Sequence, residues 1–108
     1  MDSPRVLIVE DFEDLRNLVA FFLGARGYQV LEAGNGRAAI QTALNGKPNF
    51  ILLDLRLPDI DGLEVARELR NSPATEHYRL SDGARIFHQT RSERGSGLRA
   101  LLIHTETH

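Results

Sequence analysis

The chain has 108 residues, enough for one domain with a single hydrophobic core. With 42% hydrophobic and 26% charged residues it has the composition of a globular protein, and its net charge of -2 gives no basic field for nucleic acid or an acidic membrane. The absence of cysteine excludes disulfides, thiolate metal sites and thiol catalysis. No apolar run approaches the roughly 20 residues of a membrane span or forms a signal peptide, so we expect a cytoplasmic protein.

Up to about residue 72 the sequence alternates apolar runs with helix patterns. Apolar, β-branched runs predict strands at residues 5–9, 28–33 and 49–55. After the first strand, apolar residues at helical spacing predict a helix whose inner face consists of Leu15, Leu18, Val19, Phe22 and Leu23. Asp11 is expected to cap this helix and Gly27 to end it.

Two further helices are predicted after the second and third strands. The segment 35–46 reads as a helix with Gly46 just after its end, and residues 63–71 form a helix with Leu63, Ala66 and Leu69 on its inner face. Strand and helix therefore alternate three times with short connections. This pattern favours an α/β fold in which helices cover both faces of a parallel sheet.

Acidic residues follow two of the predicted strands. Glu10 and Asp11 end the first strand, and Asp54 ends the third. If these strands are neighbours, the three carboxylates meet at one sheet edge. Their mutual repulsion is then unfavourable unless a hard divalent cation neutralises it. Oxygen ligands without His or Cys favour Mg²⁺, and a carboxylate beside it can act as a nucleophile toward phosphorus. The alternatives are that Asp11 only caps a helix and that Asp54 only opens a turn.

Two motifs, "VLIVEDFEDLRNLVAFFL" and "NFILLDLRLPDIDGLEVARELR", resemble the receiver domain of two-component response regulators over about residues 5–72. The resemblance implies a flavodoxin-like, doubly wound parallel sheet. It also implies that Asp54 accepts a phosphoryl group from a sensor histidine kinase or phosphotransfer protein. By the same resemblance, Mg²⁺ is held by Glu10, Asp11, Asp54 and the backbone carbonyl of Arg56. Pro58 and Gly62 would shape the adjoining loop.

The last third of the chain departs from this family. Receiver domains place a Ser or Thr at the end of strand four and a Lys-Pro pair at the end of strand five, whereas the only lysine here is Lys47. Ser81 is the candidate hydroxyl. We expect strands four and five to be degenerate or missing, with residues 84–87 as a candidate strand and residues 98–103 as a strand or helical turn. The expected division is a receiver core at 1–77 and a divergent tail at 78–108, non-native or disordered.

One explanation of the tail is a slip of the coding frame by one nucleotide near His77. Codons read one base later allow Ile or Thr at the Tyr78 position. They also allow Lys or Arg at the Glu106 position and Pro at the Thr107 position, near the spacing of the family. The alternative is a divergent family member with its own tail.

Three functions follow from these observations. The first is a phospho-accepting signalling module, not an enzyme, with no direct contact to nucleic acid or membrane and no room for an output domain in 108 residues. The second is a truncated or frameshifted receiver-like fragment that binds Mg²⁺ or a partner but does not switch. The third, a magnesium-dependent phosphatase, needs a second Asp where Arg56 stands. A homodimer is the expected way of covering an exposed sheet edge.

Overall fold

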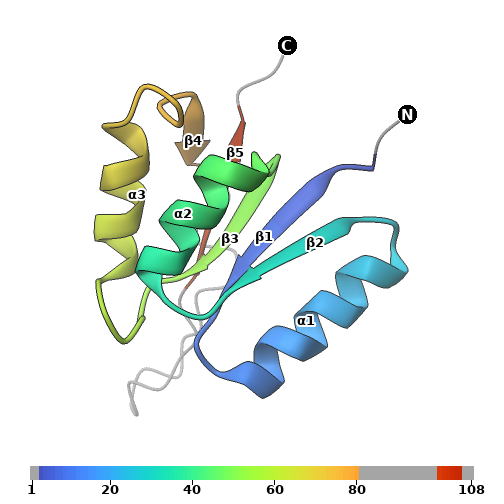
Figure 1. Cartoon of the computed structure of the whole chain (residues 1–108). Helices are drawn as coiled ribbons and strands as arrows, with labels where there is room; N and C mark the ends of the chain where they lie inside the picture. The colour runs from blue at the N-terminus through green and yellow to red at the C-terminus, as the bar shows by residue number, and fades with distance from the viewer. Residues whose placement is uncertain (1–2, 81–99, 106–108) are drawn as a thin grey trace.

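The protein is described by a computed structural model over residues 3–80 and 100–105. Its described part forms one open sheet with helices on both faces (Figure 1). The elements in chain order are β1 (Arg5–Val9), α1 (Glu13–Ala25), β2 (Gln29–Ala33), α2 (Gly36–Gly46), β3 (Phe50–Asp54), α3 (Gly62–Arg70), β4 (Tyr78–Leu80) and β5 (Ala100–Thr105). Among the described helices, none has the length and apolar character needed to cross a membrane.

The sheet has the strand order β2-β1-β3-β5-β4. β1 pairs in parallel with both β2 and β3, whereas β5 runs antiparallel to β3 and β4 antiparallel to β5. The predicted α/β fold with a mostly parallel, doubly wound sheet is confirmed. The departure from it lies in the C-terminal strands, which were predicted to be degenerate or missing. β4 has only 3 residues, whereas β5 has 6 residues and runs antiparallel to β3, which was not predicted. The predicted strand at 84–87 lies outside the described residues.

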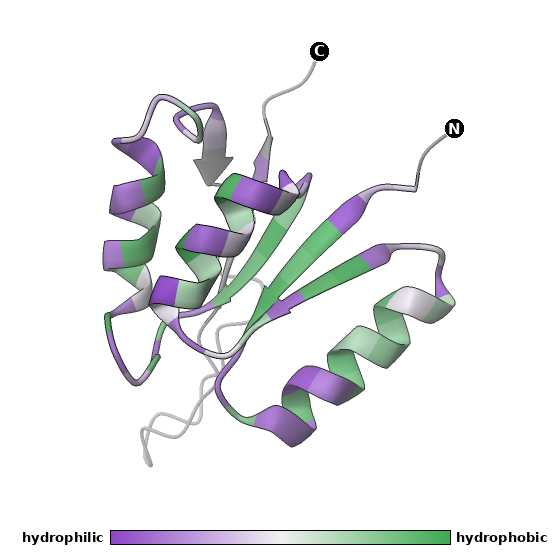
Figure 2. Ribbon diagram, in the orientation of Figure 1, coloured by the Kyte–Doolittle hydropathy of each residue, from purple (hydrophilic) through white to green (hydrophobic). Residues whose placement is uncertain are grey.

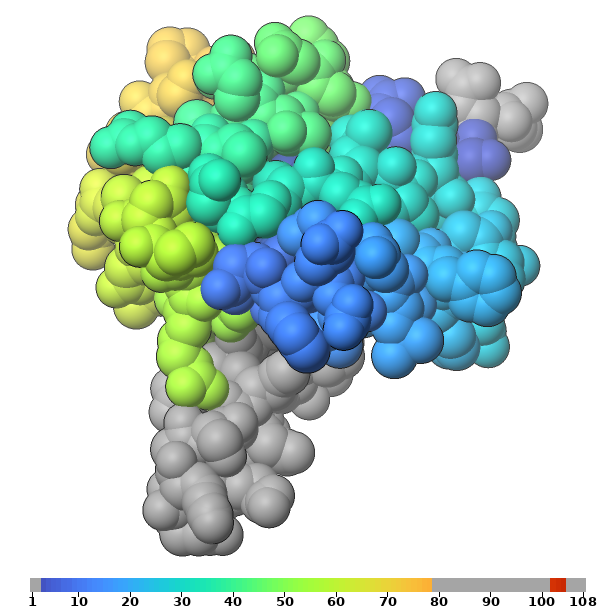
Figure 3. Space-filling model, turned by 60° about the horizontal axis from the view of Figure 1, so that its bottom comes forward, coloured from blue at the N-terminus to red at the C-terminus, as the bar shows by residue number. Residues whose placement is uncertain are grey.

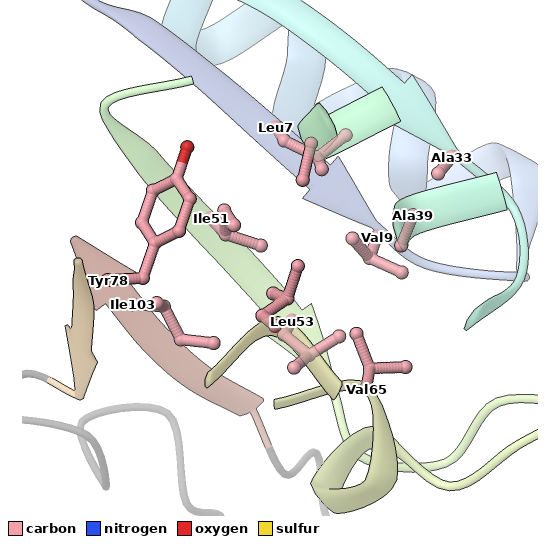
Figure 4. Packing of buried hydrophobic residues seen from close by; sticks show 11 residues of the cluster. Leu7, Val9, Ala33, Ala39, Ile51, Leu53, Val65, Tyr78 and Ile103 are labelled. Carbon is pink, nitrogen blue, oxygen red and sulfur yellow. The ribbon is translucent and has the colours of Figure 1, made fainter. Parts of the chain in front are cut away.

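The main core lies between the sheet and the pair α2 and α3. Side chains alternate along a strand, so Leu7 and Val9 of β1 share one face with Ile51 and Leu53 of β3. These side chains pack against residues of α2 and α3, among them Val65 of α3 (Figure 4). Figure 2 shows most of β1 and of β3 as continuously apolar, whereas hydrophilic segments interrupt β2. A central pair of strands that is apolar on both faces explains why β1 and β3 lie inside the sheet.

The opposite face of the sheet carries α1 (Figure 1). Val6 and Ile8 of β1 are buried outside the main core, yet no residue of α1 itself is buried. The prediction that Leu18 and Phe22 point inward is wrong, because their exposed fractions are 63% and 51%. No other described helix lies on this face, so only the side of α1 nearest β1 and β2 is covered.

The ends of α1 differ in part from expectation. The N-cap residue is Phe12, which has no side-chain acceptor, so Asp11 does not cap the helix. Instead, the backbone N–H of Phe12 donates to Glu10 Oε2 at 3.0 Å. Gly27 has φ +97° and its N–H donates to Gly24 O at 3.0 Å, so it ends the helix as predicted.

The other two helices also shift relative to the prediction. Gly46 is the last residue of α2, and Lys47 follows it with φ 47° in the left-handed region. On α3, Leu63 is 52% exposed, whereas Val65 is fully buried together with Leu69. Leu63 precedes Val65 by two residues, about 200° around the helix, so the two cannot share an inner face.

Among the described residues beyond position 77, Tyr78 and Ile103 belong to the core. Tyr78 of β4 is 4% exposed and Ile103 of β5 is 3% exposed. The hydroxyl of Tyr78 donates to the carbonyl of Pro48 at 2.5 Å, and burial raises the pKa of Tyr78 to about 12. The described part of the predicted tail is thus integrated into the sheet.

Candidate functional site

Three carboxylates meet at the carboxyl edge of the parallel strands. Glu10 and Asp11 follow the last residue of β1, and Asp54 is the last residue of β3. β1 and β3 are direct neighbours with Val9 opposite Leu53, so the acids emerge side by side. One oxygen from each carboxylate lies within 4.8 Å of the others. Figure 3 shows the loops after β1 (blue) and β3 (yellow-green) close together on this face.

The electrostatics of this cluster favour a positive charge. Glu10 and Asp54 are partly buried, and Asp11 is exposed. Desolvation, together with the negative charge of neighbouring acids, raises the pKa of both Glu10 and Asp54 above their ordinary values. Ionised carboxylates this close repel one another unless a proton or a cation intervenes. The donor set consists of oxygen only, which fits a hard ion such as Mg²⁺.

The loop after β3 is held close to Asp54. The backbone N–H of Arg56 donates to Asp54 Oδ1 at 3.0 Å, which places the Arg56 peptide beside the carboxylate. Gly62 N donates to Leu55 O at 3.0 Å. A Cβ on Gly62 would lie 2.6 Å from Leu55 Cα and 2.7 Å from Asp54 O, so only glycine permits this approach. Pro58 lies within the same loop.

The other predicted functional groups are not brought to this edge by the described residues. Ser81 lies outside the described residues. Because β5 is antiparallel, its first residue, Ala100, pairs with Asp54, and His104 pairs with Phe50 at the far end of β3. The carboxyl end of β5 therefore lies at the sheet edge opposite the carboxylates. Lys47 is also remote, since it precedes β3.

Two residues near the cluster were missed by the sequence analysis. Arg16 of α1 donates from Nη1 to the carbonyl of Glu10 at 2.9 Å and forms an ion pair with Glu32 at 3.1 Å. Asp59 of the β3–α3 loop accepts hydrogen bonds from the first residues of α2. A sequence signal for Arg16 was its place one turn into the helix that follows the acid pair. Asp59 gave no such signal, because its partners are remote in sequence.

Comparison with known proteins gives consistent matches. The family model of the response regulator receiver domain matches residues 6–91. The alkaline phosphatase synthesis transcriptional regulatory protein PhoP of Bacillus subtilis is 39% identical over 68 residues, which are 63% of this chain and 28% of PhoP. The chain thus spans less than a third of that relative.

Two solved structures illustrate the likeness in three dimensions. The response regulator TrrA of Thermotoga maritima, in complex with Mg²⁺ and BeF, is 37% identical with a TM-score of 0.60; the match covers 62% of this chain and 58% of TrrA. The chemotaxis response regulator CheY4 of Vibrio cholerae is 28% identical with a TM-score of 0.65. That match covers 68% of this chain and 62% of CheY4.

Proposed function

This chain belongs to the receiver domain family of two-component response regulators, and we propose that it accepts a phosphoryl group on Asp54 during phosphorelay signalling. The observation that carries the proposal is the convergence of Glu10, Asp11 and Asp54, whose oxygens lie within 4.8 Å of one another at one sheet edge. A sensor histidine kinase or a phosphotransfer protein would supply the phosphoryl group.

The carboxylates are the proposed ligands of Mg²⁺. Glu10, Asp11 and Asp54 supply the acidic oxygens, and the backbone carbonyl of Arg56 is the fourth proposed ligand. The ion, when bound, neutralises the charge of the carboxylates and of the incoming phosphoryl oxygens. The raised pKa of Glu10 and of Asp54 supports this assignment, since both carboxylates gain from a nearby positive charge.

Asp54 is the proposed nucleophile. Its carboxylate oxygen forms a bond to phosphorus while the bond between phosphorus and the imidazole nitrogen of the donor histidine breaks. The electron pair of the broken bond stays on the imidazole nitrogen, and the product is an aspartyl phosphate. The hydrogen bond from the Arg56 N–H to Oδ1 fixes the orientation of the carboxylate, which leaves Oδ2 for the attack.

A second candidate is a receiver-like domain that binds Mg²⁺ or a partner without switching. It is favoured by the reversed direction of β5, which places Ala100 and not a carboxyl-terminal residue beside Asp54. The shifted reading frame belongs to this candidate, with residues 1–77 as the native receiver core and 78–108 as the altered tail. Sequencing the coding DNA around the His77 codon tests it: a restored frame without a receiver-like tail excludes the slip.

Phosphorylation separates the two candidates. The chain is incubated with acetyl phosphate and Mg²⁺, and the intact mass is measured for the wild type, Asp54→Asn and the control Glu68→Gln. We expect one added phosphoryl group on the wild type and on the control, labile to hydroxylamine, and none on Asp54→Asn. A wild type that binds Mg²⁺ but gains no mass supports the inert domain. A mass gain retained in Asp54→Asn contradicts Asp54 as the acceptor.

A further inference from the structure

The loop between β3 and α3 is attached to the start of α2 through Asp59. Asp59 Oδ1 accepts a hydrogen bond from the backbone N–H of Gly36 at 2.7 Å, and Oδ2 accepts one from Arg37 at 2.9 Å. The first N–H groups of a helix have no partner within the helix, so the carboxylate satisfies two of them at once. One side chain therefore ties together segments that are 22 and 23 residues apart.

The adjoining side chain reinforces this attachment. Ile60 packs so closely on Gly36 that a Cβ there would lie 2.4 Å from Ile60 Cγ1 and 3.0 Å from Val65 Cγ2. Gly36 is buried at this contact. The absence of a side chain at position 36 thus lets the loop reach the helix. The hydrogen bonds of Asp59 and the packing of Ile60 hold the same point of the loop.

The other end of the loop is fixed at the carboxylate cluster. Asp54 Oδ1 accepts a hydrogen bond from Arg56 N at 3.0 Å, and Leu55 O accepts one from Gly62 N at 3.0 Å. The short stretch from Arg56 to Pro58 consequently spans two anchors, one at Asp54 and one at Asp59. Loss of either anchor removes one of these two fixed points of the loop.

We propose that Asp59 is a positioning residue for the metal site, acting through the backbone of Arg56. The inference rests on the proposed function, since it assigns Arg56 and the three carboxylates to Mg²⁺. The hydrogen bonds of Asp59 to Gly36 and Arg37 hold the loop to the start of α2. Its role is to hold the loop so that the Arg56 carbonyl stays beside Asp54, in the way that outer residues orient the direct ligands of a metal.

A matched pair of variants tests this role. Asp59→Ala removes the loop anchor. Asn35→Ala removes another cap of the same helix, the 2.8 Å hydrogen bond from Ala38 N to Asn35 Oδ1, in which both partners belong to α2 and its N-cap. Both variants weaken the start of α2, so urea denaturation should show a loss of stability in each. Only Asp59→Ala should change the site. Asp59→Asn, which keeps one acceptor oxygen, is the milder variant if Asp59→Ala does not fold.

Two readouts by nuclear magnetic resonance report on the site. The first is hydrogen exchange of the Arg56 amide in the metal-free chain, which follows the loop without any ligand. The second is a titration with magnesium chloride, monitored at the amides of Asp11 and Asp54. For Asp59→Ala we expect faster exchange of the Arg56 amide and a Kd for Mg²⁺ about 10-fold higher than in the wild type. Asn35→Ala should match the wild type in both.

The outcomes are distinguishable. The proposal is overturned if Asp59→Ala, or Asp59→Asn in its place, keeps the wild-type Kd and Arg56 exchange. It is also overturned if Asn35→Ala raises the Kd equally, because the cause is then the weakened helix. If the wild type itself gives no Mg²⁺-dependent shift at Asp11 or Asp54, the proposed function is refuted. The role of Asp59 at the metal site is then refuted as well.

Discussion

Replacing Asp54 by Asn should stabilise the metal-free protein. The substitution keeps the shape of the side chain and an acceptor for the Arg56 N–H, but it removes one of three negative charges whose oxygens lie within 4.8 Å of one another. Two unit charges at that distance repel by about 3.5 kcal/mol at an effective dielectric constant of about 20. Solvent reaches these carboxylates, which lowers the repulsion to roughly 1 kcal/mol per neighbour. We expect a gain of about 1–2 kcal/mol in the free energy of unfolding.

The pH dependence follows from the raised pKa of Asp54, which burial and the neighbouring Asp11 cause. A carboxyl group whose pKa is higher in the folded than in the unfolded state contributes stability below its unfolded pKa and loses that contribution as the pH rises through the folded pKa. The metal-free wild type should therefore lose stability as the pH rises from the unfolded-state pKa of Asp54 to its higher folded-state pKa. Asp54→Asn should lose less stability over the same pH range, because Glu10 is then the one of these two carboxyl groups that still has a raised pKa.

Urea denaturation at neutral pH, with EDTA or with Mg²⁺, measures both effects. In EDTA, Asp54→Asn should be the more stable chain. Saturating Mg²⁺ at about 100 times its Kd should add about 2.7 kcal/mol to the wild type and less to the variant, so that the order reverses. Glu68→Gln, which removes one negative charge from α3, should change neither result.

Two results would refute this reasoning. If Asp54→Asn is no more stable than the wild type in EDTA, the carboxylates do not repel one another in the folded chain. If Mg²⁺ stabilises the variant as much as the wild type, Asp54 is not a ligand.

Three other substitutions test the fold around the site. Tyr78→Phe leaves the buried Pro48 carbonyl without its hydroxyl donor and should cost about 1–2 kcal/mol. Because the pKa of Tyr78 is raised from 10.0 to about 12, the wild type should also lose stability as the pH rises between these values, whereas the variant should not. An equal loss of stability in the two chains over this pH range would contradict the buried phenol. Gly62→Ala places a Cβ 2.6 Å from Leu55 Cα and should lower the free energy of unfolding by about 1–3 kcal/mol. It should also weaken Mg²⁺ binding, and unchanged binding would argue against a loop fixed by this contact. Leu53→Ala, at a fully buried position, should cost about 3 kcal/mol in urea denaturation, and a loss below 1 kcal/mol would place Leu53 outside the core.

The fold was predictable wherever a local pattern decides the structure. The apolar runs of β1 and β3 identify interior strands, and strand order then brings Glu10, Asp11 and Asp54 to one edge. The loop around Gly62 was also recognisable from its Pro and Gly. These features depend on residues that are close in sequence or on the common direction of neighbouring strands.

The remaining features depend on contacts that no local pattern encodes. The apolar run that forms β5 is compatible with a parallel or an antiparallel strand, so its antiparallel pairing with β3 could not be predicted. The exposure of Leu18 and Phe22 results from what lies beside α1 and not from the helix itself. Asp59 gave no signal in the sequence, because its partners on α2 are more than 20 residues away.

The buried hydroxyl of Tyr78 also gives the protein an intrinsic optical probe. The sequence has no tryptophan and only two tyrosines, so its phenol absorbance comes from Tyr28 and Tyr78. Tyr28 stands against Phe50 at the other side of β3, with ring centroids 6.4 Å apart, whereas Tyr78 reports on β4. The absorbance of the Tyr78 phenol should therefore reveal whether the C-terminal strands are docked on the sheet, separately from the helix signal and without a label.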